Sequence, residues 1–246
     1  IRDSSRTMEH VLAEARQLAD SGVKELIVIA QDITRYGMDW DGKPHLAELL
    51  EELCKLDFHW IRLHYLYPEW IDDRLIDVIA REDKILKYLD IPLQHCNDKI
   101  LKKMNRRGDK KYLCALLDKL RERIPGLVLR TSIIAGLPGE GEEEFDELCD
   151  FLREERLERV GAFAFSPEEG TPAAQMEHVD TDEAARRAER IVDIQSEIID
   201  AWNDERQGDV MEVLCEGFDG QSMLFVGRSY AESPDIDGRI YFSAPR

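Results

Sequence analysis

Two polar pairs in the sequence carry groups that could bind a small ligand. Gln31-Asp32 follows an apolar run, and its amide and carboxylate oxygens suit an ammonium donor. Gln94-His95 ends the segment Pro92-Leu93-Gln94-His95 after another apolar run, and its amide and imidazole could hydrogen-bond sugar hydroxyls or a carboxylate. The alternatives are that Asp32 caps a turn and that His95 is a structural residue.

Arg130, Thr131 and Ser132 place charge and hydroxyl groups in an otherwise apolar run. A polar group inside such a strand must be paired or must face a cavity. Two interpretations therefore stand side by side. The side chains face a ligand cavity, or Arg130 forms a salt bridge at the floor of a barrel.

The same apolar run leads into Gly136-Leu137-Pro138-Gly139-Glu140. Because glycine has no Cβ, Gly136 would let a flat ligand approach the backbone, and Leu137-Pro138-Gly139 is typical of a tight turn. The acidic residues from Glu140 to Glu144 suit the positive end of a following helix. We therefore expect a Gly136→Val change to block a ligand while leaving folding largely intact.

The elements that must position these groups alternate between helix and strand. Strands are predicted at 24–30, 60–64, 88–91, 127–135 and 160–165. Helices are predicted at 7–21, 46–55, 71–81, 98–104 and 110–123, and around 145–152. Five strands alternating with helices predict an α/β domain with a parallel sheet, either open or a barrel arc. Polar residues follow each strand, which is the arrangement of a site at the carboxyl edge of a barrel.

The remainder of the chain predicts a second, smaller domain. A long amphipathic helix with Asp180 as its N-cap is expected to run to about Arg206. Short strands near 210–215, 223–226 and 239–242 follow, too few to close a barrel. We therefore expect an α/β domain at 1–206 and an incomplete β domain at 207–246.

The amino-acid composition limits the classes of function that the chain can have. With 246 residues and 43% hydrophobic residues the chain can bury a substantial core, and it lacks both an apolar run of about 20 residues and a signal-peptide pattern, so we expect a cytoplasmic location and no membrane. A net charge of −19 disfavours broad attraction to phosphate backbones. One basic segment, Lys99 to Lys111, is either a solvated helix face or a contact for an acidic or ribonucleoprotein partner.

Taken in order, several segments resemble the radical S-adenosylmethionine methylthiotransferases over essentially the whole chain. They are Ser5-Arg6, Gly22 to Glu25, Gln31-Asp32, Tyr67-Pro68, Pro92 to His95, Met104 to Arg107, Gly136 to Glu140 and Ser166 to Pro172. The resemblance implies a partial (β/α) barrel with S-adenosylmethionine at its open end, followed by the start of a TRAM domain. It implies cofactor contacts at Gln31, Asp32, Gln94, Arg130, Ser132 and Gly136, and a substrate contact at His95.

Within that family the chain resembles the branch that modifies a protein. The features are His95 after Pro-Leu-Gln, the pair Glu168-Glu169, and Gly227 to Tyr230 with Pro234 to Gly238. This resemblance implies transfer of a methylthio group to the β-carbon of an aspartate in the twelfth small-subunit ribosomal protein, with possible ribosome contact and a reductase as electron donor. The alternatives are a transfer-RNA methylthiotransferase and a non-catalytic ribosome-docking fragment.

The chain departs from the family at one point. The Cys-x3-Cys-x2-Cys motif expected just before the first helix is absent, and the five scattered cysteines do not replace it. We therefore predict no metal ligand and no catalytic residue within this chain, and expect the ligands of the 4Fe-4S clusters to lie elsewhere in a full-length enzyme. Since the sequence begins with Ile1, we expect a fragment that is catalytically silent by itself.

Overall fold

The computed structural model describes residues 4–244. The chain divides into two compact units, residues 1–200 and residues 201–246, and each is described by itself. In the described residues, no helix combines the length and the apolar character that a membrane crossing requires.

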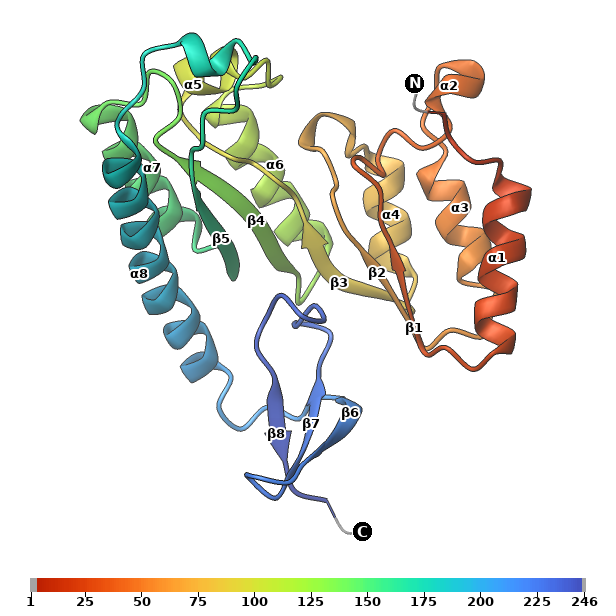
Figure 1. Ribbon diagram of the computed structural model, residues 1–246. Helices are drawn as coiled ribbons and strands as arrows, with labels where there is room; N and C mark the ends of the chain where they lie inside the picture. Colours follow the sequence, from red (N-terminus) through yellow and green to blue (C-terminus); the bar gives the residue numbers. More distant parts are fainter. Residues whose placement is uncertain (1–3, 245–246) are drawn as a thin grey trace. The chain divides into compact units, whose positions relative to one another are not determined.

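The first unit contains a sheet of parallel strands that are neighbours in the order of the sequence (Figure 1). The strands are β1 (Glu25–Val28), β2 (Trp60–Leu63), β3 (Ile85–Asp90), β4 (Val128–Ala135) and β5 (Arg159–Ala164). Each pair is parallel, from Glu25 opposite Trp60 to Ala135 opposite Ala164. Sequential parallel neighbours joined by helices are the arrangement of a (β/α) barrel arc, so the predicted fold class is confirmed.

Helices connect these strands and lie along the sheet (Figure 1). They are α1 (Met8–Asp20), α2 (Met38–Asp41), α3 (Leu46–Leu53), α4 (Asp73–Arg81), α5 (Asp98–Lys103), α6 (Lys110–Arg123) and α7 (Glu142–Glu155), with 3₁₀ turns at Pro68–Trp70 and Ala173–Gln175. Local caps set where they begin. The Asp72 carboxylate accepts a hydrogen bond from the Leu75 amide at 2.8 Å, so α4 begins two residues later than the predicted Ile71.

The core lies between the sheet and these helices. Ile61 and Leu63 of β2 are completely buried, as are Leu50 of α3 and Ile76 and Ile79 of α4. Burying a side chain of this size contributes roughly 1.5–3 kcal/mol. The core therefore fixes the sheet on its helix-covered side and leaves the other side of the strands for polar groups.

Helix α8 (Thr181–Glu205) begins at the predicted place. The Glu183 amide donates to the Asp180 carboxylate at 2.8 Å, which is an N-cap contact. One stripe of the helix is buried, at Ala184, Arg187, Ile191, Ile194 and Ile198. This stripe holds a single charged residue, Arg187, whose contacts are described below.

The second unit contains an antiparallel sheet in its described part. Strands β6 (Leu214–Asp219), β7 (Leu224–Arg228) and β8 (Ile240–Phe242) pair in that order. The predicted strand near 210–215 is wrong at its start, because residues 210–213 lie outside the strand and Val210 is fully exposed. Pairing with β7 determines which residues form β6, and apolar residue type does not. The pairing runs from Leu214 opposite Arg228 to Asp219 opposite Leu224.

Candidate functional site

The carboxyl ends of all the parallel strands surround one hollow of about 1150 Å³. Its walls are Ile29 to Gln31 after β1, Tyr65 and Tyr67 after β2, Pro92 and Gln94 after β3, Ser132, Ile134, Leu137 and Pro138 in and after β4, Phe163 to Ser166 at the end of β5, and residues of the segments 103–105 and 171–176. A hollow of this volume is larger than most ligand sites for small molecules. The polar strand ends predicted from the sequence therefore share one space.

In each polar pair at a strand end, one member lines the hollow and its neighbour does not. Gln31, Tyr65 and Gln94 are lining residues. Asp32, His64 and His95, their neighbours in the sequence, are not among the lining residues and are held by other contacts. Gln31 lies in a bend, and Tyr65 and Gln94 have positive φ values, so it is the local turn of the backbone that places one member of each pair in the lining of the hollow.

Ser132 and Gln94 are held against each other by the backbone. The Gln94 amide donates to the Ser132 carbonyl oxygen at 2.8 Å, and the Ile134 amide donates to the Gln94 carbonyl oxygen at 3.0 Å. Gln94 thereby extends the sheet by one bridge to β4. These contacts fix the positions of two side chains predicted to contact the cofactor.

The backbone is strained at two residues that line the hollow. A third lining residue, Asn105, has a φ of 55°, but this is the usual end of a helix, because its amide donates to the Lys102 carbonyl oxygen at 3.1 Å and the Arg106 amide donates to the Leu101 carbonyl oxygen at 2.9 Å. Tyr65 and Gln94 have φ values of 59° and 68°, in the left-handed region that residues with a Cβ rarely adopt. Such conformations cost about 1–3 kcal/mol each and cluster where ligands bind. Their gathering around one space is an independent indication of a functional site.

Asp32 caps a turn in the structure. Its Oδ1 accepts hydrogen bonds from the Thr34 amide at 3.0 Å and from the Thr34 hydroxyl. Burial raises the pKa of Asp32, and the two bonds from Thr34 oppose that rise only in part. The carboxylate is therefore engaged locally, and its contact with a cofactor stays a prediction.

The sheet also carries buried ion pairs that do not line the hollow, and we call this group of pairs the floor. Asp90 accepts from the Arg130 guanidinium at 2.6 Å and lies 3.3 Å from Nδ1 of His64, and Arg62 donates to Glu25 at 2.6 Å. Burial raises the pKa of Asp90, but the bonds from His64 and Arg130 outweigh it and leave the pKa below its ordinary value. The structure thus contains the salt bridge of the second sequence-based interpretation, and a cofactor contact by Arg130 stays a prediction.

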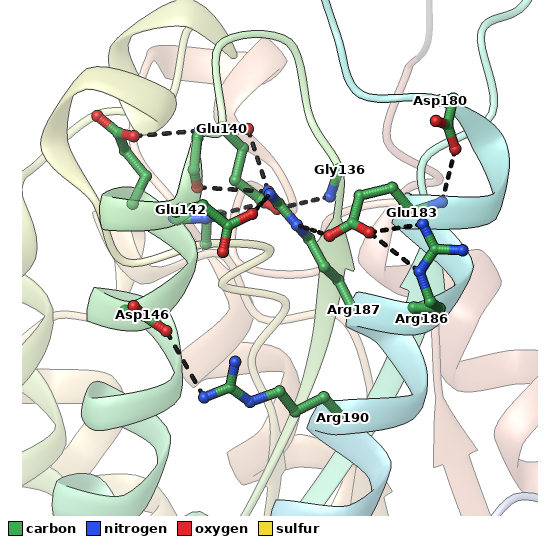
Figure 2. Close-up of polar contacts among 12 residues, drawn as sticks. Gly136, Glu140, Glu142, Asp146, Asp180, Glu183, Arg186, Arg187 and Arg190 are labelled. Atoms are coloured by element: carbon green, nitrogen blue, oxygen red, sulfur yellow. Dashed lines mark hydrogen bonds and ion pairs between the residues drawn. The ribbon is translucent and has the colours of Figure 1, made fainter.

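Gly136 starts a turn that is held from behind by Glu140 and Arg187 (Figure 2). The Gly136 amide donates to Oε1 of Glu140 at 2.8 Å, and Arg187 of α8 donates to the same oxygen at 2.9 Å. Arg187 also binds the carboxylates of Glu142 at 2.7 Å and Glu183 at 2.9 Å. Glu140 therefore turns back into the protein and precedes α7, whereas the sequence placed it in the acidic helix start.

The expectation that Gly136→Val would leave folding intact is wrong. Gly136 has a φ of +82°, and a Cβ there would lie 2.5 Å from the Cβ of Ala184 in α8. A side chain would be strained by the backbone and would displace the helix. The approach of a cofactor to Gly136 therefore stays a prediction that concerns backbone atoms alone.

His95 is completely buried next to the same turn. Its Nδ1 accepts a hydrogen bond from the Asn97 amide at 2.9 Å, and its Nε2 lies 3.2 Å from Oε2 of Glu140. A nitrogen that accepts from an amide carries no proton, so the ring proton is on Nε2, which lies near Oε2 of Glu140 without the geometry of a hydrogen bond. His95 therefore lies where it can support the turn through Glu140. Its contact with a substrate stays a prediction.

Glu140 is the ionised centre of this group. Burial raises its pKa, but the contacts from His95, Arg187 and the Gly136 amide together leave the pKa below the ordinary value. Sequence reasoning missed both Glu140 and Arg187. A signal was available for Arg187, because an arginine in the apolar stripe of an amphipathic helix must find a buried acid.

The cysteines of this chain do not fit a cluster site. Cys54, Cys96, Cys114, Cys149 and Cys215 lie on separate elements, and burial raises the pKa of Cys54 and Cys114 to about 11. Thiolates, which low pKa values favour, are the ligand form. Across residues 4–244, no three His, Cys, Asp or Glu side chains gather in a group that could hold a metal ion.

Comparison with protein families decides the classification. A model of the radical SAM superfamily matches residues 1–152, which is more than half of the chain. This chain belongs to the radical SAM superfamily. A model of the TRAM domain matches residues 208–246, where the structure has its antiparallel sheet.

Curated relatives narrow the similarity within this superfamily. The chain is 48% identical over 246 residues to the ribosomal protein uS12 methylthiotransferase RimO of Symbiobacterium thermophilum, a match that covers 99% of this chain and 51% of that protein. It is 49% identical over 240 residues to the RimO of an Anaeromyxobacter species, covering 96% of this chain and 51% of that protein. The methylthiotransferase resemblance is thereby confirmed, and the chain spans about half the length of these relatives.

Solved structures confirm the radical SAM fold. The coproporphyrinogen III oxidase HemN from Escherichia coli, a radical SAM enzyme, superposes with a TM-score of 0.56 at 18% identity, covering 78% of this chain and 46% of that chain. SuiB from Streptococcus suis bound to S-adenosylmethionine gives a TM-score of 0.53 at 17% identity, covering 84% of this chain and 43% of that chain. At these identities the likeness concerns the fold alone.

Proposed function

We propose that a protein containing this chain is a methylthiotransferase that adds a methylthio group to the β-carbon of an aspartate in ribosomal protein uS12. The observation that carries the proposal is the 48–49% identity to RimO proteins over nearly the whole chain. The alternatives from the sequence, a transfer-RNA methylthiotransferase and a non-catalytic docking fragment, find no comparable support in these relatives.

The hollow fits S-adenosylmethionine as the cofactor of this activity. Gln31, Gln94 and Ser132 offer neutral hydrogen-bonding groups for ribose hydroxyls and for the methionyl amino group. Ile134 and Leu137 offer apolar surface for the adenine ring. With a reduced iron-sulfur cluster, this cofactor supplies radical chemistry that removes a hydrogen atom from an unactivated carbon.

The residues of this chain would bind and orient rather than react. Gln94 and Ser132 are locked by their shared backbone bonds, and the turn at Gly136 is locked by Glu140 and Arg187. Preorganised groups of this kind hold reactants in place without reorganisation during the reaction. The proposed partners are uS12, the ribosome and a reductase as electron donor, in the cytoplasm.

A direct assay tests the proposal. A full-length protein that contains this chain, reconstituted with iron and sulfide under reducing conditions, is incubated with S-adenosylmethionine and either uS12 or transfer RNA. We expect mass spectrometry to find a methylthio group on one aspartate of uS12 and none on the RNA. Modification of the RNA alone would contradict the proposal.

The activity of residues 1–246 by themselves is a separate matter. We predict that this chain alone does not modify uS12, because its cysteines do not fit a cluster site. The same assay on the isolated chain checks it, and modified uS12 would show the prediction to be wrong.

A further inference from the structure

The hollow contains one formally charged residue among the described residues that line it, and that residue is Lys103. The remaining lining residues are apolar or neutral polar. This is unexpected in a chain with 52 acidic residues and a net charge of −19. The electrostatic character of the hollow therefore rests on a single ammonium group.

Lys103 is the last residue of α5 and reaches the turn after β4. Its Nζ is the atom nearest to the position that a Cβ on Gly139 would take, so the ammonium lies against the backbone of the turn. The absence of a side chain at Gly139 is what leaves room for it. Lys103 thus spans from helix α5 to the Leu137–Pro138 wall of the hollow.

Other lysines of the basic segment 99–111 are neutralised by α7. Lys99 pairs with Glu144 at 3.0 Å and Lys110 pairs with Glu147 at 3.3 Å. In residues 4–244, Lys103 has no such ion pair. Acids of α7 compensate Lys99 and Lys110. Lys102 and Lys111 also lack an ion pair in this part of the chain, so what sets Lys103 apart is that it lines the hollow.

The segment that carries Lys103 is fixed from both ends. Asn97 caps α5 by accepting hydrogen bonds from the Lys99 and Ile100 amides at 3.0 and 3.3 Å. Beyond the helix, the Arg106 guanidinium lies 4.5 Å from the centroid of the Tyr67 ring. The ammonium is therefore presented by an anchored element and not by a free loop.

The charge pattern favours one kind of partner. Lys103 is exposed although it lines the hollow, so its ammonium acts as a partly solvated charge that can pair with an anion entering the hollow. One compact ammonium matches one carboxylate. A phosphate backbone would need several cations in a row and would meet the repulsion of a strongly acidic chain.

We propose that Lys103 binds the carboxylate of the acidic side chain that the enzyme modifies, and so selects an acidic residue in a protein substrate. This inference rests on the proposed function. The sequence marked the whole basic segment Lys99 to Lys111 as a candidate contact for an acidic partner, and the structure narrows that role to one residue of the segment.

The test compares two neutral variants and one conservative variant in the full-length protein. Lys103→Met removes the charge with little change in length, and Lys103→Arg retains it. Lys102→Met is the matched control, because Lys102 is exposed on the same helix and does not line the hollow. The probes are purified uS12, uS12 in which the target aspartate is replaced by asparagine, and transfer RNA. Their binding is measured by calorimetry, alongside S-adenosylmethionine binding and turnover.

We expect Lys103→Met to weaken binding of uS12 about 10- to 100-fold, the effect of losing one charge-assisted hydrogen bond. Its affinity for the asparagine form should match that of the unchanged enzyme, and Lys103→Arg should recover most of the loss. Lys102→Met should change neither affinity. Circular dichroism checks that each variant is folded.

Four results would overturn the inference. Equal effects of Lys102→Met and Lys103→Met would show a general charge effect. A loss confined to S-adenosylmethionine binding would assign the ammonium to the carboxylate of the cofactor. A loss confined to transfer-RNA binding would assign it to a phosphate. If the unchanged enzyme modifies RNA and not uS12, the proposed function fails, whereas unchanged uS12 affinity in Lys103→Met with normal uS12 turnover refutes the role of Lys103 alone.

Discussion

The floor of the parallel sheet and the hollow at its carboxyl edge are built from the same strands but treat charge in opposite ways. At the floor, Arg130 is paired with Asp90 and Arg62 with Glu25 within buried contacts of 2.6 Å. In the hollow, two residues further along β4 from Arg130, Ser132 offers a neutral hydroxyl, and Lys103 is the one charge among the described lining residues. The floor satisfies its own polar groups, and the hollow leaves its groups available to a ligand.

Along β4, residues that stabilise the fold and residues that would bind a ligand therefore occupy different positions. Removing one partner of a buried ion pair leaves an uncompensated charge, which is strongly destabilising. Removing a neutral lining group costs the fold little, because water can replace it. Substitutions in the floor should therefore lower the stability of the fold, and substitutions of neutral lining residues should weaken ligand binding alone. Substitutions in the turn at Gly136, which is flanked by lining residues, should affect both properties.

The largest effect is expected for Asp90→Ala at the floor. It leaves the Arg130 guanidinium buried without its carboxylate, and the free energy of unfolding should fall by about 3–5 kcal/mol. Urea denaturation measures it. Asp118→Ala, at an exposed position on α6, should change the value by less than about 0.5 kcal/mol. A similar small change at Asp90 would show that the floor pair is not needed.

Arg187→Met should cost about 3 kcal/mol of unfolding free energy, because it leaves Glu140 charged and buried. Arg190→Met is the matched control (Figure 2). Arg190 lies one turn further along α8, is half exposed and lies 3.6 Å from the exposed Asp146. Its replacement should cost at most about 1 kcal/mol. Equal losses for the two variants would show that Arg187 contributes no more to stability than Arg190 does.

The pH dependence of the stability that Arg187→Met loses tests whether this loss arises from the charge of Glu140. Its pKa lies below the ordinary 4.5, so the ionised carboxylate stabilises the fold above that pH and the contribution is lost as pH falls through the folded-state pKa. Without Arg187 the pKa of Glu140 should rise. The difference in stability between the unchanged protein and Arg187→Met should therefore shrink as urea denaturation is repeated at pH values below 4.5. A constant difference would point to packing instead of charge.

Gly136→Ala tests the turn that follows β4 at the wall of the hollow. The positive φ and the close approach of Ala184 should together lower the free energy of unfolding by about 2–3 kcal/mol. Gly22 also has a positive φ, but a Cβ there meets no atom within 4 Å. Gly22→Ala should therefore cost only about 1 kcal/mol, the backbone term alone. Equal costs at the two glycines would show that contact with α8 is unimportant.

The smallest effect is expected for Ser132→Ala in the hollow. Loss of one neutral hydrogen bond should weaken S-adenosylmethionine binding to the full-length protein about 2- to 10-fold and leave stability within about 0.5 kcal/mol. Ser196→Ala on the exposed side of α8 serves as the control for both measurements. Unchanged cofactor affinity would remove Ser132 from the proposed binding site.

Much of the fold was predictable because local pattern decided it. The apolar runs that became β1 to β5 and the helical periodicity between them predicted the parallel sheet, and Asp180 marked the start of α8. The start of β6 was not predictable, because pairing with β7 decides which residues form the strand. That Val210 is apolar does not show whether it pairs with another strand.

The sequence predicted where the residues of the candidate site lie along the chain. It did not predict which of them line the hollow and which are held by other contacts. The sequence placed Gln31, Gln94 and Ser132 at strand ends, and these line the hollow. It could not tell them from Asp32 or His95, which the structure engages with Thr34 and Glu140. Neighbouring residues after a strand look equally polar in the sequence, and only the fold decides which of the two lines the hollow.

What the sequence determined by itself is the class of the molecule: alternating apolar strands and amphipathic helices, and ordered motifs that match the radical SAM superfamily. Local interactions and hydrophobic periodicity are written in consecutive residues, so they can be read without coordinates. The tertiary structure alone decided that Arg187 supports the turn at Gly136 through Glu140 and that Lys103 stands uncompensated in the hollow. Those facts depend on which distant charges meet, and burial and pairing between remote segments arise only when the chain is folded.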